Sequence, residues 1–390
     1  MLSAMNILFL YRIYPSYGGV EVITSLLANE FIKDGHKVTI ASFERGNTGL
    51  LKQLNSDVKM LELDRRIFCL SNIKQFRSWC KEQKIDIVIN QWGLPFYTSL
   101  FVKISAPTVP LISVLHGSPV VAKTLLQTEA QIKFEKNYFK KLSYKALLIF
   151  KRKVIKYGLL YNLSVNKTYV LLSKAFIPVF EKFTGKKNIE NLIAIGNPIT
   201  ISTDYSMHQF EKKHNILYVG RMDYPNKRVD RVIDFWERNC EKLHDWTLTM
   251  VGDGPYKPKV EDKAKKLPRI TLAPFQEDPP IEYYKESDVL LLTSDLEGFG
   301  LVVIEAMSYG LVPVVYGSYE AIYDIIDDGK CGIIIPKPFD NDSFDMAVRD
   351  ICNDESKRMK FSKEAVIKSR IFSITEIKKK WYLEINKAIK

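Results

Sequence analysis

Short apolar runs alternate along the chain with longer stretches whose apolar residues are spaced as in a helix. The run at residues 6–11 is followed by a turn-rich loop and then by apolar positions three or four residues apart over residues 20–34. The first pattern is typical of a buried strand and the second of an amphipathic helix. Further strands are predicted at residues 37–41, 58–63, 85–90, 111–115, 169–172 and 192–195. Helical stretches between several of them predict a parallel sheet with helices on both faces.

A second series of the same kind follows a break at Gly196-Asn197-Pro198. Residues 199–213 are polar and weakly patterned, which is typical of a linker between domains. The later strands are predicted at residues 216–219, 246–251, 270–272, 289–293, 312–316 and 332–335, and a basic amphipathic helix at residues 374–389. The pattern predicts an α/β protein with two Rossmann-like domains, residues 1–198 and 199–371, and a C-terminal helix within residues 372–390 that packs back on the first domain.

Composition narrows the class of protein. The length of 390 residues suits two domains, and 46% hydrophobic with 26% charged residues is a globular composition. The five cysteines are scattered and show no C-x-x-C spacing, which argues against a disulfide framework or zinc site and favours the cytoplasm. The chain shows no signal-peptide pattern and no apolar run of about 18 residues, so it is expected to touch a membrane without crossing it.

The formal charge of +12 is concentrated in residues 121–170, which hold ten Lys and one Arg against two Glu. Apolar residues are interleaved with these charges: Phe134, Tyr138, Phe139, Leu147, Leu148, Phe150, Tyr157 and Leu160. This composition predicts peripheral contact with an anionic membrane surface. A solvated helical face is the plainer alternative. Nucleic-acid binding is not expected, because no RRM, KH or helix-turn-helix signature occurs.

One glycine-rich turn in the second half carries candidate chemistry. Residues 295–301 follow an apolar strand and precede a helix, and they include Glu297, Gly298 and Gly300. Free N–H groups at a helix start suit a phosphate, and glycines let a ligand approach the backbone closely. Glu305 comes eight positions after Glu297, about one turn inside the helix. Both carboxylates could face one ligand and hold sugar hydroxyls. For either residue alone, a solvated or capping carboxylate is the simpler interpretation.

Two other strand ends point to the same region. Arg221 and Lys227 lie in the loop 220–228 after a predicted strand, and Arg and Lys side chains there suit a diphosphate. Gly252 begins a tight turn after the next strand. A surface loop with ordinary basic residues and a plain turn are the respective alternatives.

These pieces, in this order and at this spacing, resemble the donor domain of the family 4 retaining glycosyltransferases, over residues 218–336. The resemblance implies the GT-B fold, in which two Rossmann-like domains face each other across a cleft. It implies that residues 1–198 bind the acceptor and that residues 199–371 bind the nucleotide-sugar donor. It implies that Glu297 binds hydroxyls of the donor sugar, that Glu305 binds the ribose, and that Arg221 and Lys227 bind the diphosphate and stabilise the leaving group. It also implies phosphate or sugar contacts from the backbone near Phe299, Gly300 and Leu301, and it places Phe275 in the nucleobase loop.

The first half matches the family over residues 5–40, 111–118 and 168–198, with the middle unmatched. Gly18 and Gly19 correspond to the glycine loop that approaches the donor phosphate. His116 corresponds to a histidine near the transferred sugar. Outside the resemblance, a histidine that caps a strand end is the simpler interpretation of His116.

The activity implied is transfer of a hexose or N-acetylhexosamine, with retention, from a nucleotide sugar. UDP is a likelier carrier than GDP by family frequency. The acceptor would be a glycan or a polyprenyl-diphosphate-linked saccharide at the cytoplasmic membrane face, in polysaccharide or lipopolysaccharide assembly. No metal or other cofactor is expected, since cationic side chains take the metal's role. A non-catalytic binder of nucleotide sugar or glycan, and a GT-B enzyme of another reaction such as an epimerase or phosphorylase, are the alternatives.

Overall fold

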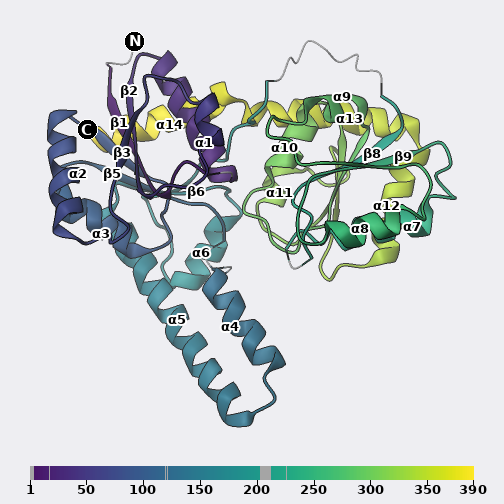
Figure 1. Ribbon diagram of the computed structural model, residues 1–390, viewed down its shortest axis with the longest axis horizontal. Coiled ribbons are helices and arrows are strands. Elements are labelled where there is room, and N and C mark those ends of the chain that lie inside the picture. The colour runs from purple at the N-terminus through teal and green to yellow at the C-terminus, as the bar shows by residue number, and fades with distance from the viewer. Residues whose placement is uncertain (1–3, 17, 119, 121, 203–211, 225) are drawn as a thin grey trace. The chain divides into compact units, whose positions relative to one another are not determined.

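The computed structural model describes residues 4–16, 18–118, 120, 122–202, 212–224 and 226–390. The chain forms two compact units, of which unit 1 comprises Met1–Asn197 with Ile377–Lys390 and unit 2 comprises Pro198–Glu376 (Figure 1). Val121, at the start of the basic segment, and residues 203–211 of the predicted linker lie outside the described residues. Pro198–Glu376 is thus inserted into unit 1, and the last helical segment of unit 1 comes from Ile377–Lys390.

Unit 1 is built on a seven-stranded parallel sheet in the order β3-β2-β1-β4-β5-β6-β7. Its strands are β1 (Asn6–Ile13), β2 (Lys37–Glu44), β3 (Lys59–Glu62), β4 (Ile87–Asn90), β5 (Leu111–Leu115), β6 (Thr168–Leu171) and β7 (Leu192–Ala194). The connecting helices include α1 (Gly19–Lys33), α2 (Leu70–Glu82), α3 (Phe96–Ser105) and α6 (Phe176–Thr184). The central strands are buried along their length, which is why they read as continuous apolar runs.

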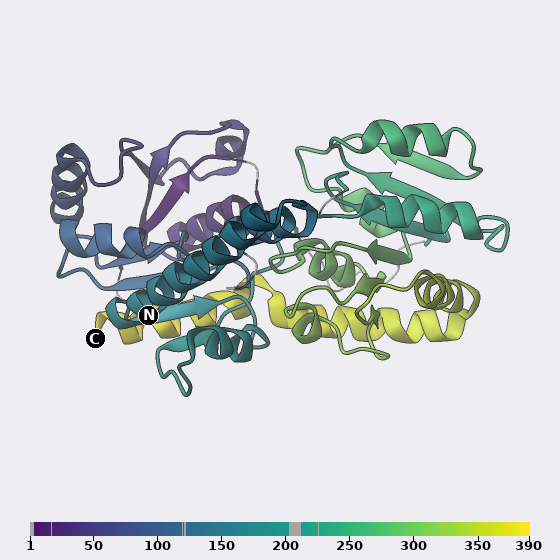
Figure 2. The same cartoon turned by 90° about the horizontal axis from the view of Figure 1, so that it is seen from below.

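The basic segment of unit 1 forms two helices, α4 (Lys123–Phe134) and α5 (Tyr138–Val165), which contact each other as a hairpin. Figure 1 shows this hairpin projecting from the sheet of unit 1, and Figure 2 shows it from below, in front of that sheet. The chain turns between the helices at Glu135, and Asn137 caps α5 by accepting a hydrogen bond from the Lys140 N–H. Only the last part of α5, around Leu159 and Leu163, is buried. Most of the hairpin is therefore exposed.

The C-terminal helix α14 (Ile374–Ile389) contacts α1 in unit 1. Lys378 Nζ lies 3.0 Å from Glu30 Oε2 and 2.8 Å from Asp34 Oδ2, and the Tyr382 hydroxyl donates to Asp34 at 2.6 Å. The Tyr382 ring also lies 5.3 Å from that of Phe31, centroid to centroid. The helix covers the α1 side of the sheet with both charged and aromatic contacts.

Unit 2 holds a six-stranded parallel sheet in the order β10-β9-β8-β11-β12-β13. Its strands are β8 (Asn215–Val219), β9 (Thr247–Val251), β10 (Ile270–Ala273), β11 (Val289–Leu292), β12 (Val312–Tyr316) and β13 (Ile333–Ile335). Its helices are α7 (Val229–Asn239), α8 (Lys257–Ala264), α9 (Ile281–Glu286), α10 (Leu301–Ser308), α11 (Ile322–Ile325), α12 (Asn341–Asn353) and α13 (Glu355–Ser369). The prediction of two parallel α/β sheets is confirmed.

Part of the predicted linker is bonded into unit 2. The Ile199 N–H donates to the Phe372 carbonyl at 2.9 Å, and the Tyr309 hydroxyl donates to the Ser202 carbonyl at 2.6 Å. Thr200, between them, hydrogen-bonds Glu305. The weak patterning of these residues reflects polar contacts with unit 2, which leave no periodic signal.

Candidate active site

The candidate residues of unit 2 gather where β8 and β11 end. These strands are neighbours in the sheet although β9 and β10 come between them in the chain, so the strand order reverses there. Ligands of open α/β sheets bind beyond the carboxyl ends of the strands at such a reversal. The loop 220–228 follows β8 and the loop 293–300 follows β11. The fold therefore brings together two loops that are about 70 residues apart.

Asp223 organises the first loop. Its side chain is 4% exposed, and its Oδ1 accepts hydrogen bonds from the N–H groups of Asn226 at 3.1 Å and Lys227 at 2.8 Å. Its Oδ2 accepts from Arg221 Nε at 2.7 Å, and the Arg221 side chain is 63% exposed. Burial alone would raise the pKa of the Asp223 carboxyl, but the hydrogen bonds from Lys227, Arg221 and Asn226 outweigh it and lower that pKa. Asp223 thus holds the loop in shape and orients Arg221.

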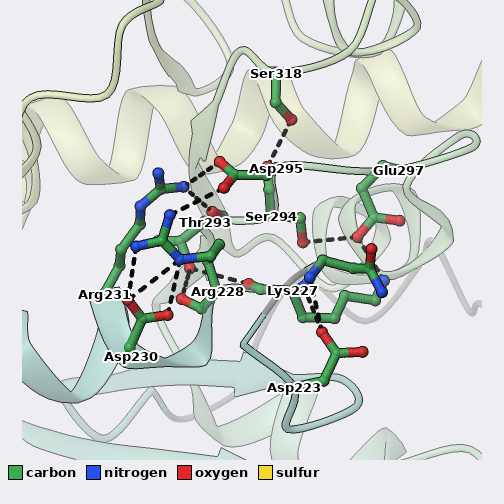
Figure 3. A network of polar contacts seen from close by, with 11 residues as sticks. Asp223, Lys227, Arg228, Asp230, Arg231, Thr293, Ser294, Asp295, Glu297 and Ser318 are labelled. Carbon is green, nitrogen blue, oxygen red and sulfur yellow. Dashed lines mark hydrogen bonds and ion pairs between the residues drawn. The ribbon is translucent and has the colours of Figure 1, made fainter. Parts of the chain in front are cut away.

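Arg228 and Arg231 join the two loops through Asp295 (Figure 3). Arg228 Nη1 lies 2.9 Å from Asp295 Oδ2, and Arg231 Nη1 lies 2.7 Å from Asp295 Oδ1. Arg228 has a left-handed backbone, φ 49°, and its guanidinium also pairs with Asp230 at 2.8 Å. The N–H of Asp295 donates to the Asn226 carbonyl at 2.7 Å. Main-chain and charged contacts together fix one loop against the other.

The centre of this network is the ion pair of Lys227 and Glu297. Lys227 Nζ lies 2.5 Å from Glu297 Oε1, and their side chains are 29% and 10% exposed. The Ser294 hydroxyl donates to the same oxygen at 2.8 Å, and the Ser318 hydroxyl donates to the Ser294 carbonyl at 2.6 Å (Figure 3). The two residues that the motifs singled out for phosphate and for sugar therefore touch each other. A ligand with an anionic and a hydroxylated part can engage both.

Glycines keep the backbone open at two points around the pair. Gly252, after β9, has φ 147°, and a Cβ there would overlap the Gly220 carbonyl oxygen. Gly300 is the N-cap of α10 with φ 89°, and a Cβ there would overlap the hydroxyl of Tyr319. Both positions need a residue without a side chain.

The Tyr319 hydroxyl is buried next to Gly300 and has no hydrogen-bond partner among the described residues. Burial, with a smaller contribution from the Glu297 charge, raises the pKa of this hydroxyl well above its usual value. A buried hydroxyl without a partner is costly and calls for an explanation. A ligand group is one that would satisfy it.

The other predicted donor-site residues of unit 2 differ in how far their side chains are exposed. Gly298 is half-buried, whereas the ring of Phe299 faces inward and lies 5.8 Å from that of Phe372. Leu301 begins α10, so its backbone is at the helix start. Phe275 follows β10, at the edge of the sheet, and is 55% exposed.

Glu305 lies apart from Glu297, inside α10. It is 8% exposed, its Oε2 accepts from the Tyr284 hydroxyl at 3.0 Å, and its Oε1 accepts from Thr200. Burial raises the pKa of Glu305, against the opposing effect of these two hydrogen bonds. In the described part of the chain, Glu297 and Glu305 have no hydrogen-bond partner in common. The expectation that both carboxylates face one ligand therefore stays a prediction.

Unit 1 holds the remaining candidates. Gly18 caps α1 in an extended conformation, and the Glu21 carboxylate turns back so far that a Cβ at Gly18 would overlap it. Gly19 begins the helix. His116 follows β5, and its Nε2 lies 2.7 Å from Gln91 Oε1. Its Nδ1 is sealed from solvent with no partner among the described residues, and burial lowers the pKa of the imidazole to about 3. His116 is therefore a neutral histidine at the end of β5.

Several residues of these networks were not found from the sequence. They are Asp223, Arg228, Asp295, Ser294, Tyr319 and Gln91. None of them stands in a pattern that the sequence marks as a site, so residue type alone carries no signal. Asp223 is the exception, because an acidic residue four positions before Lys227 in a strand-end loop could have suggested a turn that it holds.

Comparisons with known proteins give related families for both halves of the chain. Residues 205–367 match the family described as "Glycosyl transferases group 1", and residues 17–155 match "Glycosyltransferase Family 4". The chain is 25% identical over 379 residues, covering 93% of it and 94% of the relative, to the Campylobacter jejuni "GalNAc-alpha-(1->4)-GalNAc-alpha-(1->3)-diNAcBac-PP-undecaprenol alpha-1,4-N-acetyl-D-galactosaminyltransferase". It is 29% identical over 211 residues, or 51% of this chain and 57% of the relative, to the "Amylovoran biosynthesis glycosyltransferase AmsD" of Erwinia amylovora.

Among solved structures, Anabaena HepE in complex with UDP superposes with a TM-score of 0.73 at 16% identity, covering 98% of this chain and 100% of that one. At this identity the likeness concerns the fold, which is GT-B. In the described part of the chain, every helix is too short or too polar to span a membrane.

Proposed function

We propose that this chain, which belongs to the family 4 glycosyltransferases with the GT-B fold, transfers a hexose or N-acetylhexosamine from a nucleotide sugar. The acceptor is a glycan or a lipid-linked saccharide, and the reaction belongs to bacterial polysaccharide or lipopolysaccharide assembly. The observation that carries the proposal is the contact of Lys227 with Glu297 at the strand-order reversal of unit 2. A cation and a carboxylate held side by side match the diphosphate and the sugar of such a donor.

The donor site follows from the charges of these loops. Lys227 and the exposed guanidinium of Arg221 would bind the diphosphate, together with N–H groups at the start of α10. Glu297 would bind sugar hydroxyls and Glu305 the ribose, in exchange for the contacts with Thr200 and Tyr284. UDP is the favoured carrier, and HepE, a structural neighbour, was solved with UDP.

The reaction would break the bond between the anomeric carbon and the phosphate oxygen and form one from that carbon to an acceptor hydroxyl. The leaving phosphate would take the acceptor proton on the same face, so the α-configuration is retained. Negative charge develops on the departing diphosphate, where Lys227 and Arg221 would offset it. Neutral His116 would lie near the transferred sugar as a hydrogen-bonding group. Proton NMR of the product's anomeric coupling tests retention, and a β-linkage would contradict it.

The cationic side chains take over charge neutralisation, so we expect transfer to need no metal ion. Release of nucleoside diphosphate from the donor should continue at full rate in excess EDTA. Loss of the activity with EDTA and its return with Mg²⁺ would overturn this expectation.

The α4–α5 hairpin supports contact with an anionic membrane from the cytoplasmic side. Near its turn, Phe134 is 76%, Tyr138 74% and Phe139 80% exposed, and Lys140 is exposed with them. Exposed aromatic and basic residues together suit the interface of an anionic bilayer. The Campylobacter jejuni relative is named for an undecaprenol-linked substrate, which agrees with an acceptor at a membrane.

Vesicle sedimentation tests the membrane contact. Removing Lys140 and Lys141 together should weaken binding to phosphatidylglycerol vesicles at low salt by about 2 kcal/mol, or about 30-fold, at about 1 kcal/mol per charge. Lys265→Ala in unit 2, whose lysine side chain is 73% exposed, is the matched control. Equal binding by the double variant and wild type would remove the hairpin from the proposal.

The donor site is tested by thermal unfolding with UDP, GDP or ADP, with and without Mg²⁺. A nucleotide at about 100 times its dissociation constant stabilises by about 2.7 kcal/mol. UDP or GDP should raise the melting temperature without metal, and Arg221→Ala and Glu305→Ala should lose the shift. Arg45→Ala, which removes an exposed ion pair with Glu62 in unit 1, should keep it. The absence of any nucleotide shift in wild type would sink the proposed function.

A further inference from the structure

Unit 1 has a pocket of about 210 Å³ at the edge of its sheet where β1, β2 and β4 end. The order of this sheet reverses between β1 and β4, so the pocket lies at the place where open α/β sheets bind ligands. None of the residues singled out by sequence motifs lines it. The residues that carry the argument are Arg12, Glu44, Arg65, Trp92 and Tyr97.

Two aromatic rings form one wall of this pocket. Trp92 and Tyr97 are half-buried, their ring centroids are 5.4 Å apart, and their planes meet at 83°. The backbone N–H of Trp92 donates to Asn90 Oδ1 at 3.0 Å, and Tyr97 lies in the first turn of α3. The backbone that carries both rings is thus fixed before any ligand arrives. Aromatic walls with few polar groups are usual in small-molecule sites, and they pack well against the C–H face of a sugar ring.

Charged groups line the pocket together with the rings. Arg12 Nε lies 3.2 Å from Glu44 Oε1, and the Arg12 guanidinium lies 5.3 Å from the Trp92 ring centroid. Arg65 Nε lies 3.7 Å from the same Glu44 oxygen. Among the described residues, Glu44 Oε2 and the terminal nitrogens of Arg12 have no hydrogen-bond partner. They offer an acceptor and several donors, which is the set that sugar hydroxyls use.

We propose that this pocket binds one terminal monosaccharide of the acceptor glycan. The volume is below the range of about 300–1,000 Å³ that drug-sized ligands use, so it suits a single ring. Glu44 offsets one of the two arginines, which favours a neutral sugar over a multiply charged anion. Gln91, which contacts His116, directly precedes the pocket residue Trp92 in the chain. The inference rests on the proposed function, since it assigns the acceptor of that same reaction.

The test uses methyl α- and β-glycosides of glucose, galactose, N-acetylglucosamine and N-acetylgalactosamine, with saturation-transfer NMR on the full chain. At least one glycoside should bind wild type, and Trp92→Ala should raise its dissociation constant by at least about fivefold. Arg12→Ala should do the same, with partial recovery in Arg12→Lys. Tyr323→Ala, which removes an exposed ring in unit 2, is the matched control and should bind as wild type does. If Trp92→Ala unfolds, Tyr97→Phe and the Arg12 variants decide.

The inference is overturned if no glycoside binds wild type, or if the Arg12 and Trp92 variants bind it unchanged. Melting temperatures with UDP, measured on the same samples, separate this from failure of the proposed function. If UDP still raises the melting temperature but no glycoside binds, only the proposed sugar pocket is disproved. If wild type binds a glycoside that Trp92→Ala does not bind, but no nucleotide raises the melting temperature of wild type, the sugar pocket stands and the transferase function is disproved.

Discussion

The two sheets end in sites of opposite character. At the edge of unit 2, the charged side chains are paired with one another across two loops: Arg221, Asp223, Lys227, Arg228, Asp295 and Glu297. At the edge of unit 1, two aromatic rings and two arginines line a pocket with one carboxylate, and the histidine that follows β5 is neutral. The same strand-end geometry can therefore carry side chains that suit an anionic ligand or side chains that suit an uncharged one. The difference lies in the loops, which the sheet merely brings together.

The largest effect should come from closing the backbone gap in unit 2. In Gly252→Ala the new Cβ meets the Gly220 carbonyl at a positive φ, and backbone strain and overpacking of about 1–3 kcal/mol each predict a loss of about 2–6 kcal/mol in unfolding free energy. Gly117→Ala in unit 1 is the control, because a Cβ there meets nothing within 4 Å. Urea unfolding measures both. Equal stability of the two variants would show that only the charges, and not the backbone, set the unit 2 site apart.

Removing the central cation should come next. Lys227→Ala deletes a charged contact to the diphosphate, worth about 1.5–3 kcal/mol, so the dissociation constant of the nucleotide should rise about 10- to 150-fold by calorimetry. Lys285→Ala removes an exposed lysine paired with Glu282 in the same unit and should leave it unchanged. Unaltered nucleotide binding by Lys227→Ala would mean that the pair with Glu297 is structural.

The neutral histidine of unit 1 predicts a pH effect. Its pKa is lowered to about 3 in the folded chain, while an unfolded histidine binds a proton near pH 6.5. Stability is therefore lost as pH falls below about 6.5, by about 1.4 kcal/mol per pH unit, and His116→Gln should escape that loss. Urea unfolding at about pH 7 and about pH 5 measures it, with the exposed His244→Gln as control. Parallel loss in His116→Gln and wild type would contradict a neutral His116.

The smallest effect concerns the unpartnered hydroxyl of unit 2. Tyr319→Phe removes a buried group without a partner and should stabilise the free protein by about 1 kcal/mol, while nucleotide-sugar binding weakens. Tyr218→Phe should act in the opposite direction on stability, because the Tyr218 hydroxyl donates to the Arg221 carbonyl at 3.0 Å. Destabilisation by Tyr319→Phe would show that its hydroxyl is satisfied without a ligand.

The sheets were largely predictable from apolar runs. Residues 111–115 and 312–316 form strands with the predicted bounds, since a polar residue or glycine ends each run. Strands β1 and β2 extend beyond their predicted ends, to Ile13 and Glu44, because ladder pairing continues past the apolar stretch. A polar side chain at a strand end faces solvent or a pocket, and hydropathy does not mark it as part of the strand.

The site was predictable one loop at a time. Motifs singled out Lys227 and Glu297, but their contact depends on which strands are neighbours in the sheet. Thr200 and Glu305 are 105 residues apart and meet through the packing of a segment that resembled a linker. Arg12 and Trp92 belong to no motif, and only the sheet order places them in one pocket.

The position of α14 has a consequence for biosynthesis. Lys378 and Tyr382 complete the surface of α1, yet they are translated after all of unit 2. During synthesis, the nascent unit 1 lacks its final helix while the ribosome makes some 180 intervening residues. Over that time the surface of α1 around Phe31 is not covered by α14. The domain that begins first is finished last, so a ribosome stalled within the inserted unit would leave a chain with neither half complete.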